Sequence, residues 1–393
     1  MAAQLSDARG RPCVGCGRQS VKLALLTRRF DPQGGGTERD LMVTARYLLE
    51  AGYQVTAYAS EIRGESPDFA VKPVGRLPLS RAARLLAFAV AAPIAARRDG
   101  NERVLSFART IGADILRSGG GAHASYVRAA RRWRGMAGTA AMALSPYHRT
   151  QMAIERMAFR SPRLRLVIAV SNLVRDDLIA QFSLKREEVV TLYNGVDLDR
   201  FHPAANEARR LRLRAELGIQ AGAPVVLFVG NGFGRKGLGF LLEAMARVRS
   251  KARLVVVGAD RALEAYRGLA RRLEIASRVH FMGARADVEG FFEAADVFAM
   301  PSLFEPFGNV VMEAMASGLP ALTSTQSGVA ELMPEAMARC VVRDPTDPAE
   351  IAARLDELIE AGDDFREACR QVAEQYSWER YRENLLGILR SLG

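Results

Sequence analysis

The feature of this sequence that most restricts its fold is an alternation of short apolar runs with glycine-rich loops and amphipathic stretches. Val21–Thr27 is a largely apolar run of strand length, and the glycine-rich loop 31–37 follows it. Glu38–Ala51 then carries leucines and alanines at helical spacing and stops at Gly52, before a second strand over Gln54–Ser60. A strand, a loop, a helix and a strand in this order predict a parallel sheet.

Weaker signals of the same kind continue through the first half, and the second half repeats the alternation clearly. In the first half we expect strands at 104–106, 115–117, 166–170 and 189–192, with a helix from Ser171 or Asn172 to Phe182. In the second half we expect strands at 225–229, 254–257, 279–282, 297–300, 321–323 and 340–342 and helices at 238–248, 263–273, 288–294 and 310–316. The turn-rich segment 193–203 separates the halves, and 393 residues suffice for two domains. We predict an α/β protein with two doubly wound, Rossmann-like domains facing a cleft.

Composition and patterning exclude several other classes of protein. The longest run without charged or strongly polar residues is Leu85–Ala96, 12 residues against the roughly 20 that a membrane-spanning helix needs. Residues 1–20 contain no apolar core of a secretory signal, so we expect a cytoplasmic protein with a disordered leader. Cys13 and Cys16 form one CxxC pair, but no second pair or nearby histidine completes a zinc site.

Positive charge is concentrated in the first half of the chain. Residues 1–165 hold 27 basic and 12 acidic side chains, a net charge of +15, whereas the remainder has a net charge of −4. Four arginines surround Trp133 in this basic half: Arg128, Arg131, Arg132 and Arg134. The asymmetry indicates contact with a polyanion, which could be nucleic acid, anionic lipid or a phosphorylated substrate. We favour an anionic membrane surface, with a solvated helix face as the alternative.

Three loops that follow expected strands carry residues suited to a ligand, because open parallel sheets bind ligands where strands end and helices begin. In the first loop, Gly35 and Gly36 let the backbone approach a phosphate or a sugar closely, although a plain tight turn also accounts for them. The second loop is Gly230–Gly237, where Arg235 and Lys236 stand just before a helix. Two cations there suit a diphosphate leaving group, with a solvated basic turn as the alternative.

The third loop contains two glutamates around the start of a helix. Glu305 lies in the loop, Asn309 opens the helix, and Glu313 is one turn further on. Each carboxylate can accept hydrogen bonds from paired hydroxyls of a sugar or a ribose, and the N–H groups of Gly308 and Asn309 face the same space. Carboxylates that only favour the helix dipole are the alternative, but they do not explain a glutamate inside the loop.

Together these motifs resemble glycosyltransferase family 4, whose members are retaining enzymes with the GT-B fold, over the chain from Val21 onward. The most specific elements are EPFGNVVMEAMASGLP, which holds both glutamates, GRKG at 234–237 and NGVD at 194–197. The resemblance implies an acceptor-binding domain over 21–196 and a donor-binding domain over 197–376. It also implies a final helix within 377–393 that packs back on the first domain.

The same resemblance implies roles for individual residues. Glu313 would hold the nucleotide ribose, and Glu305 would contact hydroxyls of the donor sugar. Arg235 and Lys236 would contact the diphosphate. Further substrate contacts are expected from Asn231, from Arg285 near the nucleotide base, and from the backbone of Phe307, Gly308, Asn309 and Val310.

Within the family, this sequence is most similar to bacterial lipopolysaccharide core hexosyltransferases. Asp40, in the Glu-Arg-Asp that follows the first glycine loop, matches an acidic residue near the donor sugar in those enzymes. The segment 115–125 departs from them, because it carries His123 near the place of an acidic residue. Other members of the family have an active-site histidine in this region, so His123 is also expected in the site. The remaining histidines are expected to be loop or core residues: His148, His202 and His280.

These observations predict a retaining enzyme that moves a hexose from a nucleotide diphosphate sugar to a glycan or glycolipid acceptor, in lipopolysaccharide or other cell-surface polysaccharide synthesis. No Asp-x-Asp pair flanks the phosphate site, so we expect no metal cofactor. The expected partners are the donor, the acceptor and the cytoplasmic face of the inner membrane, and not nucleic acid, whose recognition motifs are absent from the sequence. An epimerase-like enzyme of the same fold is the nearest alternative, and a basic nucleic-acid-binding protein is a more distant one.

Overall fold

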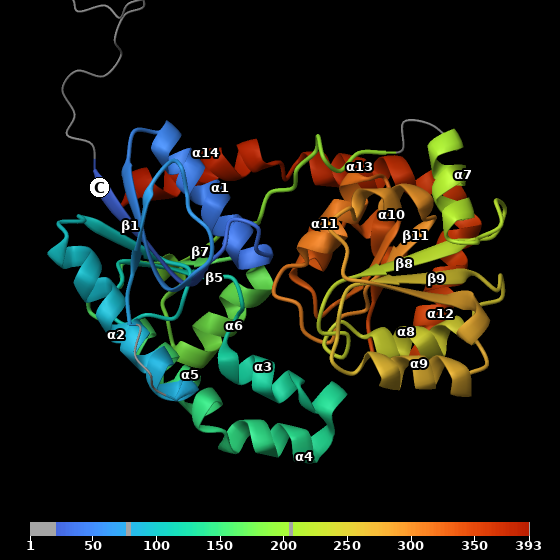
Figure 1. The fold of residues 1–393 in the computed structure, drawn as a ribbon, viewed down its shortest axis with the longest axis horizontal. Helices are drawn as coiled ribbons and strands as arrows, with labels where there is room; N and C mark the ends of the chain where they lie inside the picture. Colours follow the sequence, from blue (N-terminus) through green and yellow to red (C-terminus); the bar gives the residue numbers. More distant parts are fainter. Residues whose placement is uncertain (1–20, 76–79, 204–206, 393) are drawn as a thin grey trace, which may run out of the picture.

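The structure is a computed structural model that describes residues 21–75, 80–203 and 207–392. The expected leader, with Cys13 and Cys16, lies outside these ranges. Two lobes stand side by side, each built around one parallel sheet with helices on both faces (Figure 1). Within the described residues, no helix is both long enough and apolar enough to cross a bilayer.

In the described residues, the first lobe holds a seven-stranded sheet in the order β3-β2-β1-β4-β5-β6-β7, and all neighbouring pairs are parallel. Its strands are β1 (Lys22–Phe30), β2 (Gln54–Ile62), β3 (Ala70–Pro73), β4 (Arg103–Ser106), β5 (Ile115–Ser118), β6 (Leu166–Ala169) and β7 (Val189–Thr191). The strand order reverses between β1 and β4. Ligands of such sheets bind at this switch point, beyond the carboxyl ends of the strands.

Helices cover both faces of the first sheet. On one face lie α1 (Gly36–Glu50) and α14 (Trp378–Ser391), and on the other lie α2 (Arg81–Arg98) and α5 (Pro146–Phe159) (Figure 1). Three further helices lie toward the second lobe: α3 (His123–Ala129), α4 (Arg131–Leu144) and α6 (Asn172–Phe182). The side chain of Ser171 caps α6 by accepting a hydrogen bond from the N–H of Val174, so the expected helix start is confirmed.

The second lobe repeats the arrangement with a six-stranded parallel sheet in the order β10-β9-β8-β11-β12-β13. Its strands are β8 (Val225–Val229), β9 (Arg253–Val257), β10 (Val279–Gly283), β11 (Val297–Ala299), β12 (Ala321–Ser324) and β13 (Val341–Val342). The helices α8 (Leu238–Met245), α9 (Leu263–Arg272) and α12 (Pro348–Ala361) cover one face of this sheet (Figure 1). The opposite side carries α7 (Glu207–Glu216), α10 (Glu289–Ala294), α11 (Asn309–Ala316) and α13 (Arg366–Glu374).

The predicted fold class and most predicted elements are confirmed, with differences at the edges of the sheets. The strand expected at 340–342 begins one residue later, because Cys340 ends a 3-10 turn. The edge strand β3 was not predicted, since Lys72 and Pro73 give it little apolar pattern. The helices α3, α4 and α5 were also missed as separate elements. They form an arginine-rich surface with few buried positions, so they lack a clear apolar stripe.

The helix α14 packs on the first lobe although it follows the second lobe in the chain. Its Tyr381 hydroxyl lies 2.8 Å from Thr44 Oγ1 of α1, in a buried contact. Apolar side chains along α14 join the core formed by β1, β2 and α1: Trp378, Tyr381, Leu385, Leu386 and Leu389. The chain therefore crosses between the lobes twice, and the two crossings run side by side, with Val196 bridged to Ser377.

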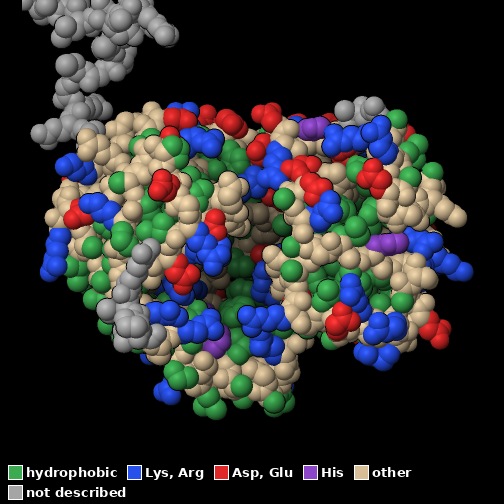
Figure 2. Space-filling view, viewed as in Figure 1, with side chains coloured by type: hydrophobic (Ala, Val, Ile, Leu, Met, Phe, Trp, Pro, Cys, Tyr) green, Lys and Arg blue, Asp and Glu red, His purple; other side chains and the backbone are tan. Residues whose placement is uncertain are grey.

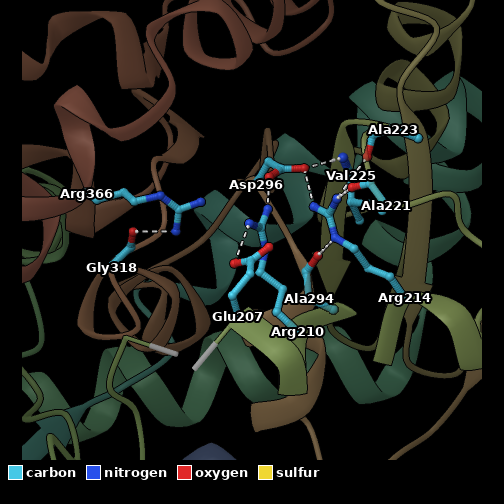
Figure 3. A network of polar contacts seen from close by, with 10 residues as sticks. All are labelled: Glu207, Arg210, Arg214, Ala221, Ala223, Val225, Ala294, Asp296, Gly318 and Arg366. Atoms are coloured by element: carbon cyan, nitrogen blue, oxygen red, sulfur yellow. Dashed lines mark hydrogen bonds and ion pairs between the residues drawn. The ribbon is translucent and has the colours of Figure 1, made fainter. Parts of the chain in front are cut away.

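A network of arginines and carboxylates fixes α7 on the second sheet (Figure 3). Arg214 is only 3% exposed and donates to the carbonyl oxygen of Ala294 and to the carboxylate of Asp296. Asp296 also accepts hydrogen bonds from Arg210 and from the N–H of Val225 at the start of β8. Because one carboxylate joins α7 to the first residue of β8, this network anchors α7 to the second sheet.

Candidate active site

The three loops singled out in the sequence meet in the cleft between the lobes. Figure 2 shows a hollow there, with Lys and Arg side chains around it. The glycine loop after β1 faces the start of α11, since a Cβ atom added to Gly36 would lie 3.8 Å from Asn309 Nδ2, while Gly35 beside it is open to space. The loops after β8 and β11 contact each other directly through their charged side chains.

Glu305 lies between the two predicted diphosphate ligands. Its Oε2 accepts hydrogen bonds of 2.9 Å from Arg235 Nη1 and of 2.9 Å from Lys236 Nζ. Burial alone would raise the pKa of Glu305, but the two cations outweigh it and bring the pKa to about 2. Burial also lowers the pKa of Lys236, although the charge of Glu305 opposes this effect. One carboxylate and two cations leave this group with one net positive charge.

Two glycines allow Lys236 to reach this position. A Cβ atom on Gly230 would lie 2.6 Å from Lys236 Cε, so only glycine leaves room for the lysine side chain. Gly237 has a φ of 80°, and a Cβ atom there would overlap the carbonyl oxygen of Pro301. The sequence GRKG therefore packs the loop after β8 tightly against the end of β11.

The start of α11 offers backbone donors to the same cleft. Gly308 precedes the helix with a φ of 114°, and its carbonyl oxygen accepts from the N–H of Val311. The first N–H groups of an α-helix have no partner within the helix, which makes the backbone of Asn309 and Val310 available to a phosphate or a sugar oxygen. Phe307 itself is buried, and its carbonyl oxygen is occupied by Ser327 Oγ. Within the expected Phe307–Val310 segment, Asn309 and Val310 carry the N–H groups that the helix itself leaves unpaired.

Glu313 is joined to the opposite lobe. Arg39 Nη1 donates to its Oε1 over 2.9 Å, across the cleft from α1 to α11. Burial raises the pKa of Glu313, and the charges of Arg39 and Arg200 act against this rise. Arg39 was not singled out in the sequence, and this contact places a cation of the first lobe beside the expected ribose ligand.

Asp40 is buried in a polar network beneath this contact. Its Oδ2 accepts from Arg117 Nη2 over 3.1 Å and from Asn194 Nδ2 over 3.3 Å. Burial raises the pKa of Asp40, and the charge of Arg117 opposes the rise. Asn194 also donates to Asn309 Oδ1 over 2.7 Å, so the network links α1, β5, the crossing segment and α11. Asp40 is only 6% exposed, and its contacts help to hold these elements together at the cleft.

His123 lies at the start of α3 and pairs with a second histidine. Its Nε2 is 2.8 Å from Nδ1 of His148, and the two rings stack with centroids 5.1 Å apart. The backbone N–H of His123 donates to the carboxylate of Glu155, which also forms an ion pair with Arg109. The expectation that His148 lies in a loop is wrong, because it belongs to α5, which brings its ring onto that of His123. His202 is exposed, and His280 is half buried in β10.

Acid should destabilise the fold through His123. Burial, then the charges of Arg109 and His148, lower its pKa from 6.5 to about 4, so the unfolded chain binds the proton more tightly. The stabilising contribution of neutral His123 is complete above pH 6.5 and is lost as the pH falls toward 4. Between pH 7.5 and 4.5, the unfolding free energy of the wild type should fall further than that of His123→Asn, by on the order of 2 kcal/mol. Urea titrations at the two pH values would measure both decreases. The exposed His202→Asn variant is the control, and equal losses in all three proteins would contradict the assignment.

Two predicted site residues stand apart from these contacts. Arg285 is exposed and pairs with Asp287 in the loop after β10. Asn231 is also exposed, and its Oδ1 accepts from the N–H of Ala259. The structure places both at the rim of the second lobe and does not bring them into contact with Glu305 or Glu313.

The segment after His123 reaches across the cleft. The ring of Tyr126 meets Phe304 edge-on with centroids 5.8 Å apart. A Cβ atom added to Gly234 would lie 3.0 Å from Trp133 Cδ1, so the indole packs on the GRKG loop. The sequence placed Trp133 among arginines on a membrane-facing surface, whereas the structure shows its ring against the donor-side lobe.

Comparisons with known proteins agree with this architecture. The family model "Glycosyltransferase Family 4" matches residues 34–200, and "Glycosyl transferases group 1" matches residues 223–361. Escherichia coli lipopolysaccharide glucosyltransferase WaaG is 27% identical, with 79% of this chain and 82% of that protein aligned. The chain spans less than two thirds of two other relatives: it matches 59% of glycosyltransferase MJ1607 of Methanocaldococcus jannaschii and 64% of spore coat protein SA of Bacillus subtilis.

Solved structures give the same result. A crystal structure of WaaG superposes with a TM-score of 0.79 at 25% identity, covering 93% of this chain and 99% of that one. Anabaena HepE, crystallised with UDP-glucose, superposes with a TM-score of 0.72 at 19% identity, covering 94% of this chain and 99% of that one. Two facing Rossmann-like domains of this kind are the GT-B fold. Within that class, this chain belongs to glycosyltransferase family 4.

Proposed function

We propose that this protein is a retaining glycosyltransferase that moves a hexose from a nucleotide diphosphate sugar to a glycan or glycolipid acceptor. The observation that carries the proposal is Glu305 held between Arg235 and Lys236 at the switch point of the second sheet. Family membership and the likeness to WaaG and HepE support a nucleotide-sugar donor. The likeness to WaaG also favours a place in lipopolysaccharide or other cell-surface polysaccharide synthesis.

The charges at the cleft suit departure of a diphosphate. When the bond between the sugar anomeric carbon and the diphosphate oxygen breaks, negative charge grows on that oxygen. Arg235 and Lys236 stabilise this charge, and the N–H groups at the start of α11 add two dipoles. Glu305, ionised at neutral pH, holds both cations and accepts hydrogen bonds from sugar hydroxyls. Glu313 and Arg39 together bind the ribose side of the nucleotide.

A panel of nucleotide sugars tests this function directly. We expect slow release of nucleoside diphosphate and free hexose from one donor, without any acceptor, and faster release when the acceptor is present. The anomeric configuration of the product, read by NMR, should match that of the donor. Conversion of the donor into a different nucleotide sugar would instead show an epimerase, and no turnover of any nucleotide sugar would contradict the proposal.

Removal of divalent metals should leave the activity intact. Arg235 and Lys236 place two positive charges at the diphosphate, where many transferases use a metal ion. Prolonged treatment with EDTA, followed by assay in chelator, should change the turnover number by less than about twofold, a change worth under ~0.5 kcal/mol in activation free energy. Loss of activity that magnesium or manganese restores would contradict this expectation.

We also propose that the first lobe rests on an anionic membrane surface. Large apolar side chains are exposed on its mutually packed helices α2, α5 and α4. They are Leu86, Val90, Ile94, Met136, Leu144 and Met157. The lobe that carries them also holds the basic half of the sequence, so exposed apolar side chains and an excess of cations occur on the same lobe.

Vesicle sedimentation tests membrane binding. We expect the protein to sediment with vesicles that contain anionic phospholipid, and high salt should release it. Met136 and Leu144 are 71% and 75% exposed, so the double variant Met136→Ser/Leu144→Ser should bind at least about fivefold more weakly, a loss of ~1 kcal/mol. Leu211→Ser, on the second lobe, is the control. Equal binding to neutral and anionic vesicles, or to neither, would overturn the proposal.

A further inference from the structure

We infer that the cavity beside Glu305 binds an acceptor sugar that carries a phosphate or carboxylate group. The inference rests on the proposed glycosyl transfer and names the chemical class of its acceptor. The cavity has a volume of about 420 Å³. Its walls come from both lobes: α3 and the start of α4 on one side, α6 behind them, and the loop 304–306 with Gln326 on the donor side.

Three arginines line this cavity on the side of the first lobe: Arg128, Arg131 and Arg132. All three are exposed, and among the described residues none of them forms an ion pair with a carboxylate, although Arg128 Nη2 donates to Ser125 Oγ over 3.3 Å. Other arginines of this lobe are committed, such as Arg109 to Glu155 and Arg117 to Asp40. The three guanidinium groups therefore bring more positive charge to the cavity than direct ion pairs of the described residues neutralise.

The carboxylates of the cavity cancel only part of that charge, because Asp177 receives its hydrogen bonds from neutral groups and keeps its own negative charge. Asp177 accepts hydrogen bonds from Ser125 Oγ over 2.8 Å and from Gln181 Nε2 over 2.8 Å. Glu305 is held by its two cations of the donor site. Outside the lining, Asp344 of the second lobe interacts with Arg132: contacts with Thr346 lower the pKa of Asp344 most, and the charge of Arg132 lowers it further. An incoming anion would be the natural counterion of the three guanidinium groups.

The rest of the lining is apolar and suits a sugar ring. Phe304 and Pro306 form the donor-side wall, and Leu173 and Val174 of α6 form the back. Tyr126 holds Phe304 in place by an edge-on contact. The C–H face of a hexose can pack on such a surface while its charged group meets the arginines. Glu305 lies in the same wall, so a hydroxyl of this sugar would stand next to the donor sugar.

Two groups of side chains on the basic helix α4 have different expected partners, an acceptor sugar and a membrane. A flat lipid surface cannot enter a cavity between two lobes, whereas a single sugar with one charged group can. Arg131 and Arg132 therefore serve the acceptor, and the exposed apolar side chains Met136 and Leu144 remain to meet a membrane.

Binding of simple sugars to the intact protein tests the inference. Glucose 6-phosphate and glucuronate are charged probes, and methyl glucoside is the neutral probe, each titrated with nucleoside diphosphate present. We expect saturable binding of at least one charged probe and at least tenfold weaker binding of methyl glucoside. In the variant Arg131→Gln/Arg132→Gln, the affinity for the charged probe should fall at least tenfold. The control Arg149→Gln/Arg156→Gln removes two exposed arginines of α5 outside the cavity and should bind like the wild type.

The other outcomes overturn the inference without touching the proposed function. Equal affinity for charged and neutral probes, or binding of neither charged probe, would show that the cavity does not select an anion. Loss of vesicle binding in Arg131→Gln/Arg132→Gln, with charged-sugar binding retained, would assign the two arginines to a lipid headgroup. Donor hydrolysis by the wild type, measured in parallel, reports on the proposed function separately. Unchanged melting temperatures would show that the variants are folded.

Discussion

Replacing Lys236 by alanine should lower the turnover number by about 10²- to 10³-fold and change KM for the donor far less. Lys236 is 7% exposed and its ammonium group lies 2.9 Å from Glu305, so its charge acts in a site from which water is largely excluded. The charge matters most when the diphosphate departs, because negative charge on the leaving oxygen is greatest in the transition state. Steady-state kinetics of donor hydrolysis and of transfer would measure both parameters.

The exposed Lys251→Ala variant is the matched control for loss of a lysine. A second comparison is Glu313→Ala, which should raise KM for the donor more than it lowers turnover, because ribose hydroxyls lose their anionic acceptor. Near-normal turnover by Lys236→Ala with every donor would show that the diphosphate does not lie at Arg235 and Lys236.

Replacing Arg117 by methionine should cost about 3–5 kcal/mol of unfolding free energy. Arg117 is 5% exposed, and its Nη2 donates both to Asp40 and to Asn194, the latter over 2.6 Å. The variant leaves a buried carboxylate without its cation and removes the contacts of the guanidinium with the rings of Phe107 and Tyr381. Urea titration at pH 7.5 would measure the loss.

The double variant Arg117→Met/Asp40→Asn tests the cause of that loss. It removes the unpaired charge as well as the cation, so it should recover part of the stability that Arg117→Met loses. The partly exposed Arg97→Met variant, which breaks the Asp114 pair at the surface, should cost roughly 1 kcal/mol or less. Equal losses in the single and double variants would show that the buried charge of Asp40 is not the cause.

Much of the fold follows from local patterns. Strands β1 and β8 lie inside parallel sheets and are covered on both faces, so Leu23–Leu26 and Val225–Val229 appear as continuous apolar runs in the sequence. The edge strand β3 and the surface helices α3 to α5 bury few side chains, so periodicity gives no clear signal for them. The start of α11 could be predicted because Gly308 and Asn309 mark it by their residue types.

The candidate site was predictable only within one lobe. The family resemblance assigns Glu305, Arg235 and Lys236 to one donor site, and the structure brings them together because β8 and β11 are neighbours in the sheet. The Arg39–Glu313 pair, the His123–His148 pair and the acceptor cavity depend on how the lobes and α5 are placed in space. No spacing in the sequence encodes those distances. The only available signal for Asn194 was its position in NGVD, which assigned it no contact.

The position of α14 has a consequence for biogenesis. The core of the first lobe uses Tyr381 and the leucines of α14, which the ribosome produces only after the entire second lobe. During synthesis, the side of α1 around Thr44 and Tyr47, which α14 contacts in the folded protein, stays uncovered until then. Domains usually complete their folding in the order in which they leave the ribosome. In this protein that order is reversed for the last step, so a chain that stops after the second lobe would present an uncovered surface for chaperones or proteases to recognise.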